Sequence, residues 1–128
     1  MTNSQKIEQY MIALNLSFEE IEPSVWLIDD SDKTLEHVAV ILTDNLVTIR
    51  CALMREPSEK KEEFFRLLLN LNAADLIHGA YALDGDEVIL IDSLECETMD
   101  FEEFQASLDA FSLAMLNHYK ILSQYRNN

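Results

Sequence analysis

The chain has only two glycines, Gly79 and Gly85, and both lie in one short stretch, HGAYALDGDEVIL. Glycine is required where the backbone φ must be positive or where another segment comes very close. The geometry of the chain is therefore specified most tightly in this stretch. The Asp-Gly pair at residues 84–85 predicts a two-residue hairpin between strands at 80–83 and 87–92, and Gly79 predicts the reversal that leads into the first of them.

The second strand of this hairpin contains the run VILI at residues 88–91. Its apolar residues fall on both faces of a strand, because successive side chains point to opposite sides. This pattern is typical of a strand that is covered on both faces, so we expect it to be central in its sheet.

Three apolar, β-branched and aromatic runs precede that hairpin, at residues 18–29, 37–42 and 47–53, and Pro23 divides the first of them. Val38 and Val40 share one face of the second run, and polar residues separate the runs as turns would. The pair Asp44-Asn45 tolerates the positive φ of a tight hairpin. The runs predict an antiparallel meander of three strands.

Three helices are expected around these strands. Residues 4–14 carry apolar side chains at the i, i+3, i+4, i+7 spacing of an amphipathic helix. Pro57 suits the first turn of a second helix, in which the acidic residues Glu59, Glu62 and Glu63 complement the helix dipole. Asp100 and Glu103 form a capping box before a long helix, whose apolar positions recur at spacings of three and four: Phe101, Phe104, Leu108, Phe111, Met115, His118, Leu122 and Tyr125.

The predicted order is therefore α-β-β-β-α-β-β-α in a single α+β domain that spans residues 1–128. The first and last helices each have one apolar stripe and need one partner surface, so we expect both against one face of an antiparallel sheet. The second helix is apolar around most of its circumference, which predicts burial on more than one side. Its candidate dimer-forming residues are Phe64, Phe65, Leu68 and Leu71.

Charge excludes one class of partner. The chain has 24 acidic and 9 basic residues and a net charge of −15, so a nucleic-acid backbone would be repelled. No Lys or Arg occurs between Arg66 and Lys120, and the acidic residues of this interval include Glu95, Glu97, Glu102 and Glu103. Two interpretations remain open for this acidic surface: a solvated face that keeps the protein soluble, or a binding surface for a basic partner.

No apolar run approaches the roughly 18 residues of a membrane span, and the N-terminus does not follow the pattern of a secretory signal. We therefore expect a cytoplasmic protein that does not insert into membranes. In that compartment Cys51 and Cys96 are expected to be reduced and buried.

Catalytic and metal-binding motifs are missing. The acidic stretch that begins at Asp30 does not match an EF-hand calcium loop. Leu35 stands at the sixth position, which requires glycine, and Ile41 stands at the twelfth, which requires a bidentate carboxylate. The three histidines are scattered, and His118 at a helical core position is expected to be structural. There is no nucleophile elbow, P-loop, dinucleotide fingerprint or C-x-x-C pair. The sequence predicts a non-enzyme without cofactors.

The order of elements, together with LLLNLNAADLIHGAYALDGDEVILIDSLECETMDFEEFQASLDAF at residues 67–111, resembles the CesT-like family. That family contains the dimeric chaperones of type III secretion and the YbjN-type proteins, which are proposed regulatory or sensory factors. The resemblance rests on structural motifs and covers the N-terminal half by architecture only. It implies a homodimer without catalytic activity.

Two functions follow from this resemblance as expectations. The first is a chaperone-like protein that holds a segment of a client polypeptide, with Lys or Arg in that segment if the acidic surface takes part. The alternative is a regulatory or sensory module of the YbjN type without a role in secretion.

Overall fold

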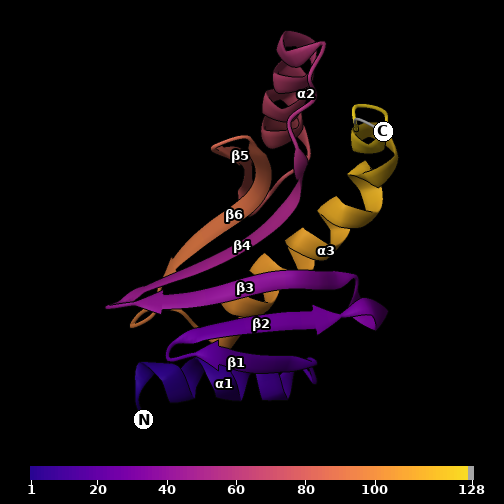
Figure 1. Cartoon of the computed structure of the whole chain (residues 1–128). Coiled ribbons are helices and arrows are strands. Elements are labelled where there is room, and N and C mark those ends of the chain that lie inside the picture. The colour runs from indigo at the N-terminus through magenta and orange to yellow at the C-terminus, as the bar shows by residue number, and fades with distance from the viewer. Residues whose placement is uncertain (127–128) are drawn as a thin grey trace.

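The computed structural model describes residues 1–126 as three helices around one six-stranded antiparallel sheet (Figure 1). The strand order is β1-β2-β3-β4-β6-β5. The α+β class with an antiparallel sheet packed by helices is confirmed. The elements are α1 (Asn3–Ala13), β1 (Phe18–Glu22), β2 (Val25–Asp30), a 3-10 turn η1 (Ser31–Lys33), β3 (Leu35–Thr43), β4 (Leu46–Arg55), α2 (Lys61–Ala74), β5 (Ala80–Asp84), β6 (Glu87–Glu95) and α3 (Phe101–Ser123).

The meander has four strands, so the predicted count of three is wrong by one. Residues 18–29 form the hairpin β1–β2, in which Phe18 pairs with Ile28 and the register shifts between Glu20 and Glu22. Pro23 occupies the turn together with Ser24, whose φ is +64°. Proline has a fixed φ that suits a turn, and here it joins two strands instead of interrupting one. Asp44 has a φ of +55° in the next turn, as expected.

Both glycines have positive φ, for different reasons. Gly85, with a φ of +62°, is the first residue of the two-residue turn between β5 and β6, and Asp84 pairs with Glu87 across it. The turn is therefore Gly85-Asp86, one residue later than predicted. Gly79 has a φ of +80°, and a Cβ atom there would lie 3.0 Å from the carbonyl oxygen of Ile91 and 3.2 Å from the ring of Phe111. Gly79 thus combines a reversal of the chain with a close approach.

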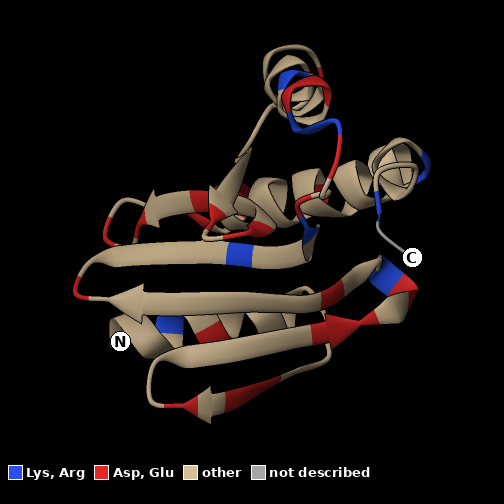
Figure 2. Cartoon of the chain, turned by 45° about the horizontal axis from the view of Figure 1, so that its top comes forward, with Lys and Arg blue, Asp and Glu red and all other residues tan. Residues whose placement is uncertain are grey.

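Helices α1 and α3 lie on one face of the sheet, as predicted (Figures 1 and 2). Both start with a capping box, Thr2 with Gln5 in α1 and Asp100 with Glu103 in α3. The ring of Tyr10 in α1 packs edge-on against Phe101 at the start of α3, with centroids 5.5 Å apart. The core between helices and sheet includes the fully buried side chains Ile7, Met11, Trp26, Ile28, Val38, Val40, Val47, Ile49, Leu90, Phe104 and Phe111.

Helix α2 begins later than predicted. Pro57 lies outside the helix, because Lys60 precedes the first turn with a left-handed φ of +61° and a right-handed helix cannot run through that conformation. Glu62 and Glu63 lie in the first turn, as expected for the helix dipole. Glu59 precedes the helix, so the prediction that it lies in the first turn is wrong.

Asn72 fixes α2 against the edge of the sheet. Its side-chain amide donates to the carbonyl oxygen of Tyr81 at 3.1 Å, and its Oδ1 accepts from the Tyr81 N–H at 2.7 Å. The side chain therefore bonds the outer edge of β5 as a neighbouring strand would. At the other end of α2, the ring of Phe64 packs against Tyr125, which follows α3, with centroids 5.1 Å apart. Strand β6 lies between β4 and β5, so its predicted central position is confirmed.

Candidate functional site

The four acidic residues singled out in the sequence gather at one corner of the fold. Glu95 ends β6, Glu97 lies in the connection, and Glu102 and Glu103 lie in the first turn of α3. All four side chains are exposed. We call this group, Glu95, Glu97, Glu102 and Glu103, the acidic corner. It presents several carboxylates to solvent within one short segment.

The backbone of this corner is held from outside the segment. The N–H of Glu97 donates to Oδ1 of Asn45 at 2.8 Å, and the N–H of Cys96 donates to the carbonyl oxygen of Asn45 at 2.7 Å. Lys6 of α1 donates to the carbonyl oxygen of Cys96 at 2.5 Å. Glu103 also accepts from the N–H of Asp100 in the capping box, so part of the acidity stabilises the start of α3.

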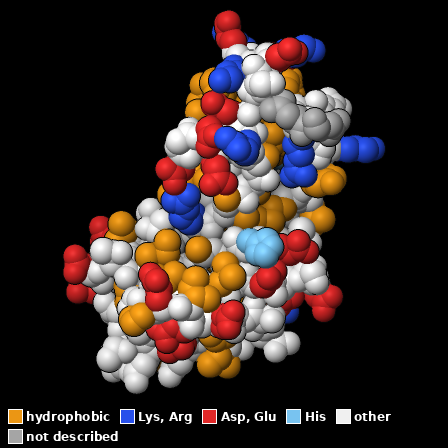
Figure 3. Space-filling view, viewed as in Figure 1, with side chains coloured by type: hydrophobic (Ala, Val, Ile, Leu, Met, Phe, Trp, Pro, Cys, Tyr) orange, Lys and Arg blue, Asp and Glu red, His pale blue; other side chains and the backbone are white. Residues whose placement is uncertain are grey.

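Most basic side chains gather at the opposite end of the molecule from the acidic corner, with Lys6 and Lys33 as exceptions. Figure 3 shows Lys and Arg around the upper part, near α2, whereas acidic side chains dominate the lower part. Two of these cations pair with local carboxylates: Arg55 with Asp86, and Lys61 with Glu56 at 3.3 Å. The negative net charge is therefore distributed unevenly, and Lys6 of α1 is the cation that reaches the backbone of the acidic corner.

The four residues proposed for a dimer helix are not equivalent. Phe64, Leu68 and Leu71 are buried within the chain's own core, and Phe65 is half-buried. Leu69 is 67% exposed and lies with Phe65, Lys61 and Arg66 around a shallow hollow. Sequence reasoning missed Leu69, because a helix that is apolar all round gives no sign of which side faces the sheet edge and which faces solvent.

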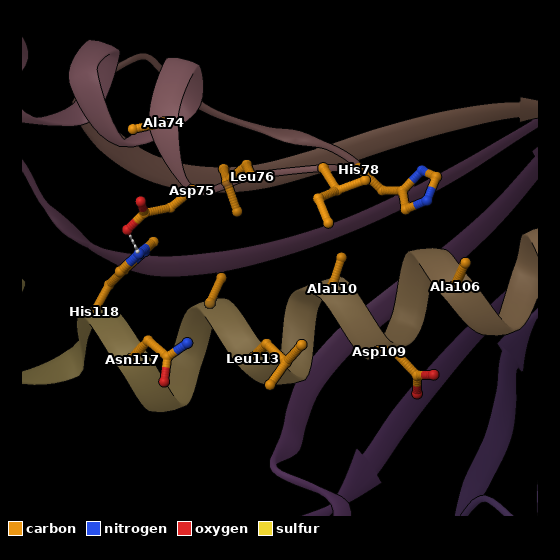
Figure 4. Close-up of a pocket in the computed structure, with 12 residues that line it drawn as sticks. Ala74, Asp75, Leu76, His78, Ala106, Asp109, Ala110, Leu113, Asn117 and His118 are labelled. Atoms are coloured by element: carbon orange, nitrogen blue, oxygen red, sulfur yellow. Dashed lines mark hydrogen bonds and ion pairs between the residues drawn. The ribbon is translucent and has the colours of Figure 1, made fainter.

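Sequence reasoning also missed a groove between α3 and the connection from α2 to β5 (Figure 4). Its volume is about 670 Å³, and Ala106, Ala110 and Leu113 of α3 form one side while residues 74–78 form the other. We refer to it as the α3 groove. No sequence motif indicates it, because its two sides are about thirty residues apart along the chain and meet only through the fold.

One end of the α3 groove carries a hydrogen-bonded chain of three side chains. The hydroxyl of Tyr81 lies 2.5 Å from Nδ1 of His118, and Nε2 of His118 lies 3.0 Å from Oδ2 of Asp75. Burial, and then the charge of Asp75, raise the pKa of the Tyr81 hydroxyl well above its usual value. In the neutral tautomer whose Nε2–H donates to the Asp75 carboxylate, Nδ1 of His118 accepts from the Tyr81 hydroxyl.

Both ring nitrogens of His118 therefore have partners, and the side chain is almost fully buried. The prediction that His118 is a structural residue is confirmed. Its hydrogen bonds tie α3 to β5 and to the end of α2, which fixes the spacing of the two sides of the groove.

The cysteines lie in unreactive surroundings. Both are buried and unpaired. Burial raises the pKa of the Cys51 thiol to about 11, and burial is also the main reason why the pKa of the Cys96 thiol is raised. Thiols with raised pKa values are poor nucleophiles at neutral pH.

Within residues 1–126, no three or more His, Cys, Asp or Glu side chains are grouped as metal ligands would be. None of the helices described there has the length and apolar character needed to cross a membrane. The candidate sites described above are three surfaces: the acidic corner, the exposed side of α2 and the α3 groove.

Comparison with known proteins identifies a family model and solved structures that are similar to this chain. The family model CesT_Tir_1 matches residues 1–128. Among solved structures, YbjN from E. coli is 17% identical with a TM-score of 0.65, covering 92% of both chains. A chain in the ExsC-ExsE complex is 14% identical with a TM-score of 0.53, covering 97% of this chain and 96% of the other.

A third solved structure, the HopA1-SchA chaperone-effector complex, contains a chain that is 9% identical with a TM-score of 0.57. The alignment covers 95% of this chain and 91% of that one. A search of curated proteins found no match. At these identities the solved structures establish a shared fold.

Proposed function

This chain belongs to the family described by the CesT_Tir_1 model, and from that premise we propose that it is a chaperone-like protein that holds a segment of a client polypeptide. The match of the family model over the whole chain carries the proposal. Two similar folds occur in complexes, ExsC-ExsE and the chaperone-effector pair HopA1-SchA, which supports a protein partner. The proposed role is binding without catalysis, in the cytoplasm.

The client segment is proposed to carry Lys or Arg. The acidic corner presents four exposed carboxylates, in an interval of the sequence that contains no basic residue. Charges of this kind attract a basic segment over distances of about 8 Å at physiological salt. Exposed strand backbone and apolar grooves between helix and sheet would supply the short-range contacts.

Neutralising the acidic corner is expected to slow client binding. The client is first isolated by affinity purification from the native host, and the purified pair is then studied by surface plasmon resonance. Raising the salt concentration from 50 to 500 mM should lower the association rate constant about tenfold and leave the dissociation rate constant nearly unchanged. Replacing Glu95, Glu97, Glu102 and Glu103 with Gln should have a similar effect at low salt, without unfolding the domain.

A matched variant controls for net charge. Replacing Glu19, Glu22, Glu36 and Glu59 with Gln removes the same number of exposed carboxylates from other parts of the surface. We expect this control to change the association rate by less than about twofold. If client binding responds neither to salt nor to the acidic-corner variant, the acidic corner only aids solvation and the client is recognised through apolar contacts.

We further infer a homodimer formed through α2. Of the four candidate residues, Phe65 reaches the surface, next to the exposed Leu69. A symmetric interface would use this patch on both copies. Multi-angle light scattering should give twice the chain mass of 14.7 kDa, and Leu69→Lys should return it to 14.7 kDa.

The control for that variant is Leu116→Lys, which adds the same charge at an exposed leucine of α3. It should leave the mass of the dimer unchanged. A wild-type chain that runs only as a 14.7 kDa monomer at high micromolar concentration would contradict the homodimer.

A regulatory module of the YbjN type is the second candidate, favoured by the fold similarity to YbjN, which is described as a proposed transcription regulator. A net charge of −15 disfavours direct contact with DNA, so such a role would act through a protein partner. Genes for a secretion apparatus or a secreted client beside this gene favour the chaperone-like role, and their absence favours the regulatory one.

A further inference from the structure

The α3 groove exposes apolar side chains that no other part of residues 1–126 covers. Ile77 is 88% exposed on one side, and Leu113 is 57% exposed on the other. Between them, Ala106 and Ala110 contribute only methyl groups to the surface of α3, so another backbone can approach the helix closely (Figure 4). A volume of about 670 Å³ lies within the usual range of roughly 300–1,000 Å³ for binding pockets.

The α3 groove carries carboxylates but no Lys or Arg. Every lining residue falls within the interval from 67 to 119 that lacks Lys and Arg, and the carboxylates of Asp75 and Asp109 are among them. Asp109 is exposed, and the Asp75 side chain remains 51% exposed although its Oδ2 bonds His118. A cation at either end would therefore meet a carboxylate, and the lining contains no Lys or Arg that would compete with it.

The groove continues into the acidic corner along α3. Residues 102, 106, 109 and 113 follow the i, i+4, i+7, i+11 spacing that places side chains on one face of a helix. Glu102 of the acidic corner thus lies on the same face as Ala106 and Leu113. One extended ligand can contact the Glu102 carboxylate and the apolar part of the groove together.

We propose that the α3 groove binds an extended, apolar polypeptide segment flanked by Lys or Arg. This inference rests on the proposed function and assigns the client segment to a defined surface. The part of α3 from Ala106 to Asn117 is about 17 Å long at 1.5 Å per residue, which corresponds to five or six extended residues. A second copy of this chain is a poor occupant, because a symmetric contact through the groove would bring Asp75 and Asp109 of both copies together.

The test uses a synthetic peptide, acetyl-Lys-Ala-Leu-Ala-Leu-Ala-Lys-amide, titrated into the ¹⁵N-labelled full chain and followed by NMR. We expect saturable shifts of the Ile77, Ala110 and Leu113 amides. Replacing both leucines of the peptide with serine should weaken binding at least tenfold, because apolar burial is lost. Replacing both lysines with glutamate should weaken it by at least as much, because the groove and corner carboxylates repel it.

Matched protein variants locate the site. Leu113→Ser should weaken peptide binding about fivefold, whereas Leu116→Ser, at an exposed leucine of the same helix that lines a separate hollow beside His37, should leave it unchanged. Asp109→Asn should weaken binding two- to fivefold, and Asp32→Asn, an exposed carboxylate elsewhere, should have no effect. All four positions are exposed, so the variants are expected to fold.

The proposal is wrong if the peptide does not bind saturably, if the glutamate peptide binds equally well, or if Leu113→Ser and Leu116→Ser behave alike. It is also wrong if Leu113→Ser dissociates a dimer while the peptide leaves the groove amides unshifted, because the groove then binds a second copy. If the client binds the wild type and Leu113→Ser with equal affinity and without competition from the peptide, the assignment of the client segment to the α3 groove is overturned. That result would leave the chaperone-like function intact. The peptide experiment tests the groove, and the client experiment tests the function.

Discussion

Replacing Phe111 with alanine is expected to lower the free energy of unfolding by about 3–5 kcal/mol, the usual range for deletion of a buried aromatic ring. Its side chain is fully buried in the middle of α3, within the core and against the site where Gly79 reverses the chain. Urea denaturation followed by circular dichroism should show a lower midpoint with an unchanged slope. A loss of this size is a large share of the roughly 5–15 kcal/mol that stabilises a typical domain.

Leu113→Ala is the matched control, because the residue lies two positions along the same helix and is largely exposed. It should change the free energy of unfolding by less than about 0.5 kcal/mol. Similar losses in the two variants would mean that Phe111 does not occupy the core as described.

Replacing Gly79 with alanine is expected to lower the free energy of unfolding by about 2–5 kcal/mol. A φ of +80° is unfavourable for a residue with a Cβ atom, by roughly 1–2 kcal/mol. The added methyl would also meet the Ile91 carbonyl oxygen at 3.0 Å and the Phe111 ring at 3.2 Å, and overpacking of this kind costs about 1–3 kcal/mol. The same urea experiment measures the effect.

Gly85→Ala separates the two causes. Its φ of +62° has the same sign, but no atom lies within 4 Å of the added methyl. We expect a loss of about 1–2 kcal/mol from backbone conformation alone. Equal losses at Gly79 and Gly85 would contradict the close packing at Gly79. The double variant with Phe111→Ala should lose less than the sum of the single variants, because removal of the ring relieves one of the two contacts.

Local signals in the sequence predicted much of this fold. The capping box at Asp100, the apolar spacing of α3 and the glycines of the β5–β6 hairpin all depend on neighbouring residues, and their elements were confirmed. Signals that depend on a single backbone conformation were harder to interpret. Pro23 could end a strand or occupy a hairpin turn, and the left-handed φ of Lys60, which delays the start of α2, has no counterpart in residue type.

The candidate sites also differ in how far they depend on residues that are neighbours in the sequence. The residues of the acidic corner are close in sequence and therefore stay close in the fold. The α3 groove depends on contact between segments far apart in the chain, and the only sequence signal for it is the absence of Lys and Arg from both of its sides. On α2, apolar composition indicated burial but did not distinguish the chain's own core, which takes Phe64, from an external partner.

The pairing of Asn72 with Tyr81 limits how this sheet can grow. A strand added beside β5 would have to displace a side chain that already occupies the N–H and C=O groups of Tyr81. The other edge, β1, has a shifted register and carries Glu19, Glu20 and Glu22, yet no side chain binds its backbone in this way among the hydrogen bonds described for residues 1–126. A molecule with one open edge can pair through it once. Association of single chains through β1 alone would therefore end at two copies.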